Sequence, residues 1–534
     1  MSRKNILRSS STLVFFTFTS RILGLFREIV KAAFLGTTAL SDAFTIAFLI
    51  PNLLRRLFAE GTISAAFIPT FKGYLNKGSK EETAQFLSAI FTFGVTVFFG
   101  TVLTGMIFSG VLVDIFGPDL GGDISKEAVF LTRIMFPYLA FISIAALIQG
   151  ILNSFGVFGP SGFTPVLFNL SFITFAFVLS PYTANPARAI AIGVVTGGMI
   201  QALFQVPFMI KKGVKFSFSG FKTAFTHPGV RKVLRLVAPT MLGMGAYQIN
   251  IIVTTRIANM AGTGIVSSLQ FSNRLEELIL GVFIISLSTV ILPELSADAK
   301  KENWESFNKN LIFGIKLTAM VSIPATIFTL IMRYEIVTLL FKFGKFDDES
   351  VRLTAYALLF HICGLFFIAI SRILFPAFFA QEDTVTPTVA GVISVIVNIV
   401  VAILLVESMK GGGVALASTI SAAVSAFVLI AMLTKSGKVK KEGIKDSAVY
   451  SLKLLLIAFL SILPLYFLKD TIYDVFKEIM IFPGHFNRIV TELIPFIVST
   501  FIFGSCLTAL LIAVKDENTV YIFNKVAGRL KWKK

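Results

Sequence analysis

The chain has 534 residues, of which 55% are hydrophobic and 15% are charged, and its formal net charge at pH 7 is +18. Its mean hydropathy of +0.83 excludes a soluble protein with a fully hydrated surface. Such a basic net charge also occurs in nucleic-acid-binding proteins, so the positions of the basic residues must decide between that class and a membrane protein.

Long apolar stretches follow one another along the whole chain. Crossing about 30 Å of hydrocarbon takes about 20 helical residues, and a segment in lipid must satisfy its own backbone hydrogen bonds, which favours helices. We therefore predict an all-α polytopic membrane protein with about 14 transmembrane helices and no soluble domain. The predicted spans are residues 10–34, 42–70, 84–112, 129–153, 161–180, 187–210, 234–259, 266–292, 309–332, 352–378, 386–406, 412–434, 448–468 and 490–514.

The first predicted span contains four charged residues, Arg21, Arg27, Glu28 and Lys31. An ionised side chain near the bilayer centre costs roughly 2.5–3.5 kcal/mol on insertion scales, so such residues are rare unless they face a cavity. At about 100° per residue, Arg21 and Glu28 share one stripe of the helix, and Arg27 lies about a third of a turn away. We expect Lys31, near the end of the span, to extend its amine to the membrane interface.

The second predicted span adds five polar residues, Asp42, Asn52, Arg55, Arg56 and Glu60. Asp42 is either a helix N-cap or a ligand-binding group. Arg56 and Glu60 are four residues apart, so they form either a structural pair or part of a site.

The eighth predicted span contains another arginine, Arg274, which precedes Glu276 and Glu277. The two glutamates lie either at the water boundary or in a cavity. Arg21, Arg27 and Arg55 lie well inside spans, where contact with lipid would be costly. We therefore expect them to share a water-filled cavity with Arg274. Several guanidinium groups in one cavity suit an anion, above all a phosphate, which they bind in a bidentate manner.

The basic residues concentrate in alternate loops. The N-terminus, the loops near 71–83, 211–235, 297–309 and 435–447, and the C-terminal tail contain about 27 Lys and Arg, against about 10 on the other side. This asymmetry places both termini in the cytoplasm. The net charge is therefore a topology signal, and we expect no nucleic-acid binding.

A weak internal repeat divides the chain. AFIPTF with Pro69 and VILPEL with Pro293 end the second and eighth spans, and Pro165 and Pro387 open the fifth and eleventh at a nearly equal offset. Two such markers favour two parallel six-helix halves. We predict lobes at 1–215 and 216–440, with 441–534 adding helices 13 and 14 and a basic tail.

Catalytic and metal-binding patterns are missing from the sequence. Cys363 and Cys506 fall inside spans, and the three histidines have no metal-ligand spacing. The glycine-containing loops lack phosphate-loop spacing. We therefore expect a transporter with non-covalent chemistry, no cofactor and no metal site, with Asn398 as a weak candidate ligand.

Three motifs resemble those of the MurJ (MviN) lipid II flippases of the MOP exporter superfamily: SRILGLFRE (20–28), SDAF (41–44) and PNLLRRLFAEGTISAAFIPTF (51–71). The resemblance implies two six-helix lobes around a central cavity and two added helices that form a groove for a polyprenyl tail. It also implies the substrate, the undecaprenyl-diphosphate-linked disaccharide-pentapeptide used in peptidoglycan and cell-wall biogenesis. The family's cavity arginines fall on Arg21, Arg27, Arg55 and Arg274, and its acidic residue on Asp42. Asn52 and Glu60 lie in its motif.

Three positions depart from this family pattern. Glu28 and Asn273 stand where members often have Asp, and Thr254 replaces an Asp of sodium-coupled members. Glu28 keeps the charge, so we expect it to contribute to substrate binding, whereas Thr254 puts a sodium site in doubt.

We expect a monomeric flippase in the bacterial cytoplasmic (inner) membrane that moves lipid II from the inner to the outer leaflet by alternating access. It would work among membrane lipids and beside other cell-wall synthesis proteins. The alternatives are an exporter of another polyprenyl-diphosphate-linked glycan or of drugs, and a membrane enzyme acting on polyprenyl diphosphates. A cationic-drug exporter would need an acidic cavity, and an enzyme would need paired carboxylates or a histidine-based nucleophile.

Overall fold

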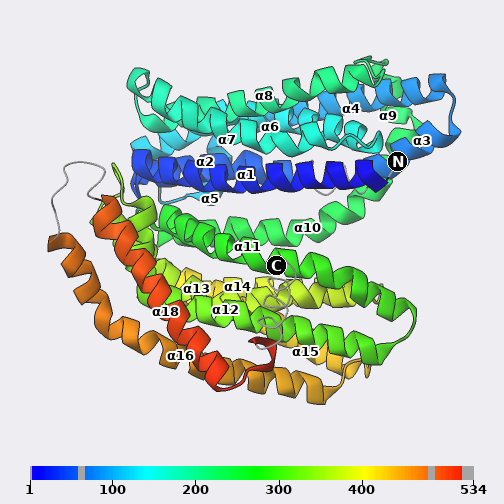
Figure 1. The fold of residues 1–534 in the computed structure, drawn as a ribbon. Coiled ribbons are helices and arrows are strands. Elements are labelled where there is room, and N and C mark those ends of the chain that lie inside the picture. The colour runs from blue at the N-terminus through cyan, green and yellow to red at the C-terminus, as the bar shows by residue number, and fades with distance from the viewer. Residues whose placement is uncertain (1–2, 58–65, 479–487, 520–534) are drawn as a thin grey trace. The chain divides into compact units, whose positions relative to one another are not determined.

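The computed structural model describes residues 3–57, 66–478 and 488–519 of the chain. These residues are almost entirely helical (Figure 1). The elements are α1 (Arg3–Leu35), α2 (Ala39–Arg55), α3 (Ile68–Lys77), α4 (Lys80–Ile107), α5 (Ser109–Phe116), α6 (Gly122–Ser154), α7 (Gly159–Leu179), η3 (Ser180–Tyr182), α8 (Pro186–Lys211), α9 (Phe221–Thr226), α10 (Pro228–Met260), α11 (Ile265–Lys300), α12 (Trp304–Phe341), α13 (Asp348–Phe379), α14 (Val385–Met409), α15 (Gly411–Lys435), α16 (Lys441–Glu478), η4 (Ile489–Leu493) and α18 (Ile494–Ala513).

The all-helical membrane class predicted from the sequence is confirmed. Among the described residues, ten helices are long and apolar enough to cross a membrane, judged by length and composition alone. The total of fourteen spans stays a prediction. The predicted third span, 84–112, is divided, because α4 ends at Ile107 and α5 begins at Ser109.

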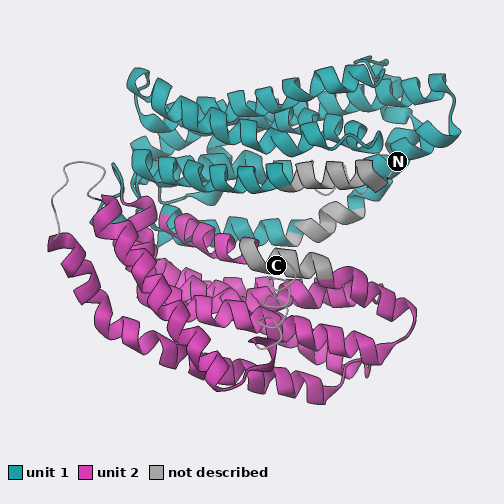
Figure 2. Cartoon of the chain, in the orientation of Figure 1, with its two compact units in different colours: residues 1–267, 343–350 teal, residues 268–342, 351–534 magenta. Residues whose placement is uncertain are grey.

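Two compact units make up the chain (Figure 2). Unit 1 comprises residues 1–267 and 343–350, and unit 2 comprises 268–342 and 351–534. The sequence-based lobes at 1–215 and 216–440 stay a prediction.

In unit 1, α6 packs against α2, α4 and α8, and α7 packs against α1 and α8. Glycines let α7 and α8 approach closely: a Cβ atom on Gly193 would lie 2.8 Å from Phe175 Cβ, and one on Gly197 would lie 3.0 Å from Phe168 Cδ2. Small residues take this role in membrane bundles because helices gain mostly van der Waals contact there. The core between these helices includes Val30, Phe44, Met135, Phe172 and Val194.

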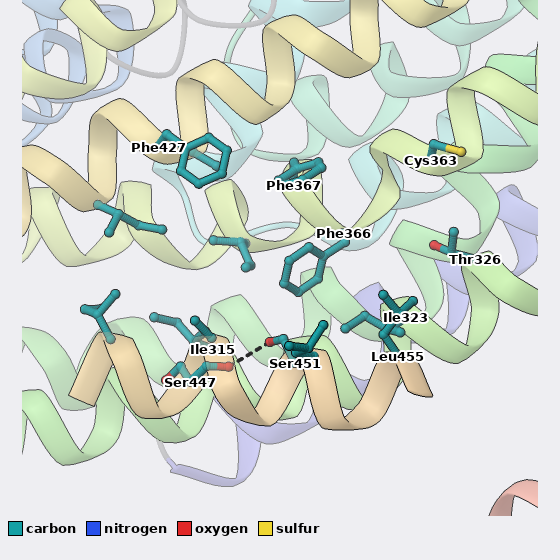
Figure 3. A pocket seen from close by; sticks show the side chains of 16 residues that line it. Ile315, Ile323, Thr326, Cys363, Phe366, Phe367, Phe427, Ser447, Ser451 and Leu455 are labelled. Atoms are coloured by element: carbon teal, nitrogen blue, oxygen red, sulfur yellow. Dashed lines mark hydrogen bonds between the residues drawn. The ribbon is translucent and has the colours of Figure 1, made fainter. Parts of the chain in front are cut away.

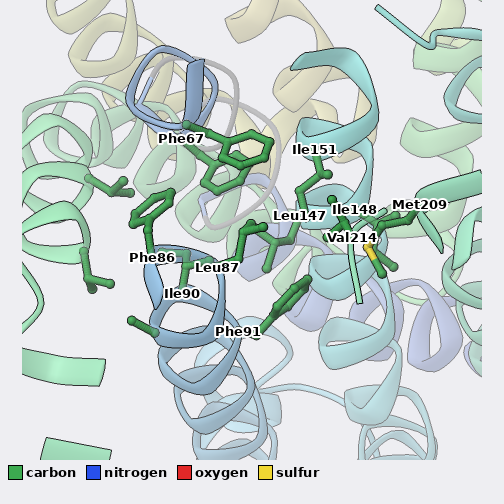
Figure 4. Close-up of a cluster of buried hydrophobic side chains, with 14 of the residues drawn as sticks. Phe67, Phe86, Leu87, Ile90, Phe91, Leu147, Ile148, Ile151, Met209 and Val214 are labelled. Carbon is green, nitrogen blue, oxygen red and sulfur yellow. The ribbon is translucent and has the colours of Figure 1, made fainter. Parts of the chain in front are cut away.

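A second core of unit 1 lies where α3, α4, α6 and the end of α8 meet (Figure 4). Phe67, Phe71 and Phe86 stack on one another with ring centroids 5.4–6.4 Å apart. The beginning of α4 is fixed by a capping box, in which Ser79 Oγ accepts from Glu82 N (3.1 Å) and Ser79 N donates to Glu82 Oε2 (2.8 Å). The capping box therefore defines the residue at which α4 begins, with its charged first turn ahead of the apolar remainder.

In unit 2, α14 packs against α15, and α16 and α18 pack against α12 and each other. Leu454, Ala458 and Leu511 form a small core with Ala319 and Ile323 of α12. The added pair of helices therefore belongs to the same compact unit as α12.

Candidate functional site

The charged stretch of α1 is held by α7. Arg27 donates through Nη2 to Glu28 Oε1 (2.6 Å) and through Nη1 to Asn169 Oδ1 (3.2 Å). Its guanidinium carbon lies 5.8 and 5.6 Å from the ring centroids of Phe168 and Phe172, within the range of cation–π attraction. Asn169 Nδ2 also donates to the Ser20 carbonyl (3.1 Å). An ion pair inside an apolar bundle is thus oriented by one amide and two rings.

Arg21 and Glu28 have different surroundings. Arg21 is exposed, whereas the Glu28 side chain is only 6% exposed. The helical stripe that they share therefore passes from an accessible part of α1 to a buried one.

The expectation that Lys31 reaches the membrane interface is wrong. Lys31 is 3% exposed. Its Nζ donates to Thr45 Oγ1 (2.9 Å) and lies 5.8 Å from the Phe44 ring centroid. The nearby helix α2 supplies both an acceptor and an aromatic face, so the amine has no need to leave the bundle.

Asp42 is buried, with 1% of its surface exposed. Its carboxylate accepts from Gly264 N (2.6 Å), Ser267 N (2.8 Å) and Ser267 Oγ (2.5 Å). The N-cap of α2 is Thr38, whose side chain accepts from Ser41 N, so the N-cap reading of Asp42 is wrong for its own helix. Asp42 instead binds the turn that leads into α11.

The end of α2 contains a second polar pair. Arg55 Nε donates to Asn52 Oδ1 (2.8 Å), and both residues are partly buried. Pro51 is buried one residue earlier inside the helix. Glu60, and with it the predicted Arg56–Glu60 pair, lies outside the described residues.

Arg274 belongs to unit 2, where its Nη1 donates to Glu277 Oε2 (2.6 Å) and both side chains are exposed. The neighbouring Glu276 is buried, so the two glutamates have opposite environments. Asn398, the weak candidate ligand, is buried in α14. Participation of Arg21, Arg27, Arg55 and Arg274 in one site stays a prediction.

A mainly apolar cavity of about 470 Å³ lies between α12, α13, α15 and α16 in unit 2 (Figure 3). Its polar lining comes from Thr326, Cys363, Ser447 and Ser451, and Ser451 Oγ donates to the Ser447 carbonyl (2.8 Å). The apolar lining includes Ile315, Phe366, Phe367, Phe427, Ile430 and Leu455. The cavity therefore offers a flexible hydrocarbon chain apolar contacts at almost every point.

Sequence reasoning missed Asn169, Thr45 and Ser267. Asn169 had a usable signal, because it is an amide in the middle of the apolar run 161–180, where a polar side chain needs a partner. Thr45 and Ser267 had none, since hydroxyls are common in membrane helices and their partners lie 14 and 225 residues away.

Known proteins match this chain over most of its length. The family model for the lipid II flippase MurJ matches residues 31–484. A probable lipid II flippase MurJ from Treponema pallidum is 39% identical over 523 residues, which covers 97% of each chain. The corresponding protein of Vibrio cholerae is 36% identical over 429 residues, covering 78% of this chain and 81% of its own. The lipid II flippase MurJ of Burkholderia cenocepacia is 33% identical, with 81% and 84% covered.

Solved structures agree. A lipid II flippase MurJ in an inward closed conformation has a TM-score of 0.75 at 26% identity, covering 94% of this chain and 99% of that one. A multidrug resistance MATE family transporter of the MOP superfamily, in an inward-facing conformation, has a TM-score of 0.66 at 14% identity and shows the fold alone, covering 82% and 98%. The resemblance seen in residues 20–71 is therefore confirmed: the chain belongs to the MurJ family of lipid II flippases.

Proposed function

We propose that this protein flips lipid II from the inner to the outer leaflet of the bacterial cytoplasmic membrane by alternating access. The relatives that match most of this chain are named as probable or established lipid II flippases. Lipid II combines a diphosphate, a large polar headgroup and a long polyprenyl tail. A protein that moves it needs a cationic polar site and a separate apolar one, with no covalent step.

The main structural support for this proposal is Arg27 with its partners Glu28 and Asn169. Its two hydrogen bonds to Glu28 and Asn169 use two of the five N–H donors of the guanidinium. The remaining donors can bind a phosphate oxygen, and a planar fork held by Asn169 is already oriented for such a contact. Glu28 limits the positive charge of the group when no diphosphate is bound. We propose that Arg21, Arg55 and Arg274 complete the diphosphate site.

The apolar cavity between α12, α13, α15 and α16 supports a matching role for unit 2. A polyprenyl tail gains about 25 cal/mol for each Å² of apolar surface it buries away from water, but much less when it leaves lipid. The cavity would therefore align the tail, with affinity supplied mainly by the headgroup. We propose that the tail occupies this cavity while the headgroup crosses.

Alternating access requires contacts that form in one state and break in another. We propose that the three hydrogen bonds from Gly264 and Ser267 to the Asp42 carboxylate are such a contact. We infer that it closes one side of the transporter and opens when the headgroup leaves on that side.

Orientation and assembly complete the proposal. We propose that both termini lie in the cytoplasm, which the excess of Lys and Arg in alternate loops supports. Cysteines introduced at Ser79 and Ser125 should then react from opposite sides of the membrane. We further propose that the protein works as a monomer beside other cell-wall synthesis proteins, driven by an ion gradient, the membrane potential or removal of the substrate outside.

The decisive experiment compares arginine variants in cells depleted of the native protein, at matched membrane expression. Arg27→Lys keeps the charge next to Glu28 but loses the bidentate fork, so we expect lipid II to accumulate on the inner leaflet and growth to stop. Arg274→Lys should do the same. Arg133→Lys is the matched control. Arg133 in α6 donates a hydrogen bond to Ser109 in α5 and has no part in the proposed site.

Analysis of the accumulated lipid separates the alternatives. Build-up of lipid II supports the proposal, whereas build-up of a different polyprenyl-linked glycan identifies an exporter of that glycan. Normal growth and flipping by both Arg27→Lys and Arg274→Lys would overturn the proposed diphosphate site.

A further inference from the structure

Residues 211–227 run from the last residue of α8 to the residue before α10. They combine basic and aromatic side chains and are called the basic–aromatic linker below. Its sequence, KKGVKFSFSGFKTAFTH, contains four lysines and no acidic residue. Lys211, Lys212, Lys215 and Lys222 are all exposed, and so are Phe216, Phe218 and Phe221, at 41%, 63% and 63%. None of these residues belongs to the proposed diphosphate or tail site.

One side of the linker is fixed to α4 by specific contacts. Ser217 Oγ and Ser88 Oγ are 2.6 Å apart, and Ser219 N donates to Thr92 Oγ1 (2.9 Å). The linker is therefore not a loose loop, and its orientation on α4 is defined.

Packing contacts reinforce this arrangement. Phe216 lies 4.9 Å from Phe91 and Phe225 lies 5.0 Å from Phe93, measured between ring centroids. Val214 is buried in the core that α4 and α6 share (Figure 4). With the inner side fixed in this way, Phe218 and Phe221 must face outward.

The contacts on α4 place the linker at the edge of the hydrocarbon. From Ser88 to Ile107, the last residue of α4, the helix rises about 28 Å at about 1.5 Å per residue. That length matches a hydrocarbon core of about 30 Å. The charged first turn of α4, Lys80 to Glu82, then lies in water, and the linker lies between the two at headgroup depth. Aromatic rings and lysines are the side chains that favour this depth.

We propose that the basic–aromatic linker is a binding surface for anionic phospholipid headgroups. Phe218 and Phe221 insert between the lipids, and the four lysines pair with the phosphates around them. The lack of any acidic residue in the linker makes its charge complementary to an anionic leaflet. The segment that joins α8 to α10 is thereby held on the membrane surface.

A single-tryptophan reporter tests the proposal in the full-length protein. Trp304 and Trp532 are the two tryptophans of the chain. Both are replaced by Phe, and Phe218→Trp is added. The protein is reconstituted in phosphatidylcholine vesicles with a minority of phosphatidylglycerol, and bromine is placed on either lipid in turn. Because one lysine near an anionic surface shifts partitioning by about fivefold, we expect brominated phosphatidylglycerol to quench the reporter well beyond its mole fraction.

Two comparisons make the result specific. Lys215→Gln with Lys222→Gln should bring quenching by brominated phosphatidylglycerol much closer to its mole fraction, because only Lys211 and Lys212 remain, and high salt should have the same effect. These lysines are exposed, so their loss leaves the packing of the linker on α4 intact. Phe501→Trp in α18 is the control reporter, because Phe501 is 74% exposed and its helix has no charged residue. It should report the mole fraction in all conditions.

Quenching of the Phe218→Trp reporter in proportion to mole fraction, with the lysines intact, would overturn the proposal. So would the absence of quenching by either lipid, which would place the linker in water and favour a soluble partner.

Discussion

Asn169 connects two helices and orients a charge at the same time. Its amide oxygen accepts from Arg27, and its amide nitrogen donates to the Ser20 carbonyl of α1. A side chain that both donates and accepts is needed here, because the two α1 groups are a donor and an acceptor. Asn169 is therefore a positioning residue for the proposed diphosphate site.

Asn169→Leu tests this role, since it keeps the size and removes both hydrogen bonds. We expect the free energy of unfolding to fall by about 1–3 kcal/mol and flipping to fall further than stability alone explains. Thermal unfolding and a flipping assay measure the two effects. Asn308→Leu is the control, because Asn308 also bonds two carbonyls, those of Trp304 and Lys438, away from the site. Equal flipping by the two variants at matched stability would contradict the positioning role.

His227 is the N-cap residue of α10 and lies in the linker outside the spans. Its Nδ1 accepts from Gly229 N (3.1 Å), and burial lowers the pKa of His227 below its ordinary value of 6.5. A lowered pKa means that the folded state binds the proton less readily than the unfolded state, so stability is kept above pH 6.5 and declines as the pH falls through the folded pKa. The neighbouring titratable group is Tyr74, whose ring centroid lies 6.2 Å away.

We therefore expect the melting temperature of the purified protein to fall between pH 7 and pH 5 and His227→Asn to flatten that decline. Asn retains a side-chain acceptor for the N-cap but does not titrate. Melting curves for both proteins across this range give the difference directly. Parallel pH profiles would contradict the assignment.

At the scale of elements, the end of α12 is hydrogen-bonded to an arginine that precedes η4 and α18. The Arg488 guanidinium donates to the carbonyls of Thr338, Leu339 and Lys342 in the last turn of α12. The Thr338 carbonyl also accepts from Lys342 N (3.2 Å). Carbonyls at the end of a helix need partners from outside it, and a cation there also complements the helix dipole. Arg488 therefore joins α18 to α12 at one end.

Arg488→Met should lower the free energy of unfolding by about 1–3 kcal/mol and loosen α18 from α12. Thermal unfolding and limited proteolysis measure the effect. Arg488→Lys retains one charged donor and should recover part of the loss. An unchanged melting temperature in Arg488→Met would show that solvent satisfies these carbonyls equally well.

Ten of the described helices were predictable because each is long and apolar enough to cross a membrane. Pro, Gly and Ser at the boundaries also gave usable signals, such as Ser79 before Glu82 at the start of α4. The break at Phe108 was not predictable, since its surroundings are as apolar as the helices on either side. Ser109 and Gly110, directly after Phe108, form a pair that often kinks helices, but on its own this pair is a weak signal inside an apolar run.

The charged residues of the site were visible, but their partners were not. Cost in the membrane singled out Arg27 and Lys31, and the family motif singled out Asp42. Only tertiary contacts decide that Lys31 turns to Thr45 and that Asp42 binds a turn 222 to 225 residues away. Sequence spacing tells which residues share one face of a helix. Which residues of another helix contact that face depends on how the bundle packs.

At the scale of the whole molecule, the chain passes between its two compact units three times, at 267/268, 342/343 and 350/351. The short return, 343–350, packs on the end of α1: Lys345 N donates to the Ala33 carbonyl (2.8 Å), and Thr37 Oγ1 donates to Ser350 Oγ (2.9 Å). Gly36 and Gly344 both have positive φ, and a Cβ on either would collide with the opposing backbone. These turns therefore tolerate only glycine.

Hydrogen exchange can follow the opening that we propose for the Asp42 contact. The amide protons of Gly264 and Ser267 are both bound by one carboxylate, so they exchange with deuterium only when that contact opens. Their exchange rate therefore measures how often this contact opens, without any label on the lipid. We expect slow exchange in the resting protein, and exchange about tenfold faster or more in Asp42→Asn, because the hydrogen bonds lose a charged acceptor. Mass spectrometry of the peptide covering 261–267 records both, and equal rates in the two proteins would show that the Asp42 charge does not control the opening of this contact.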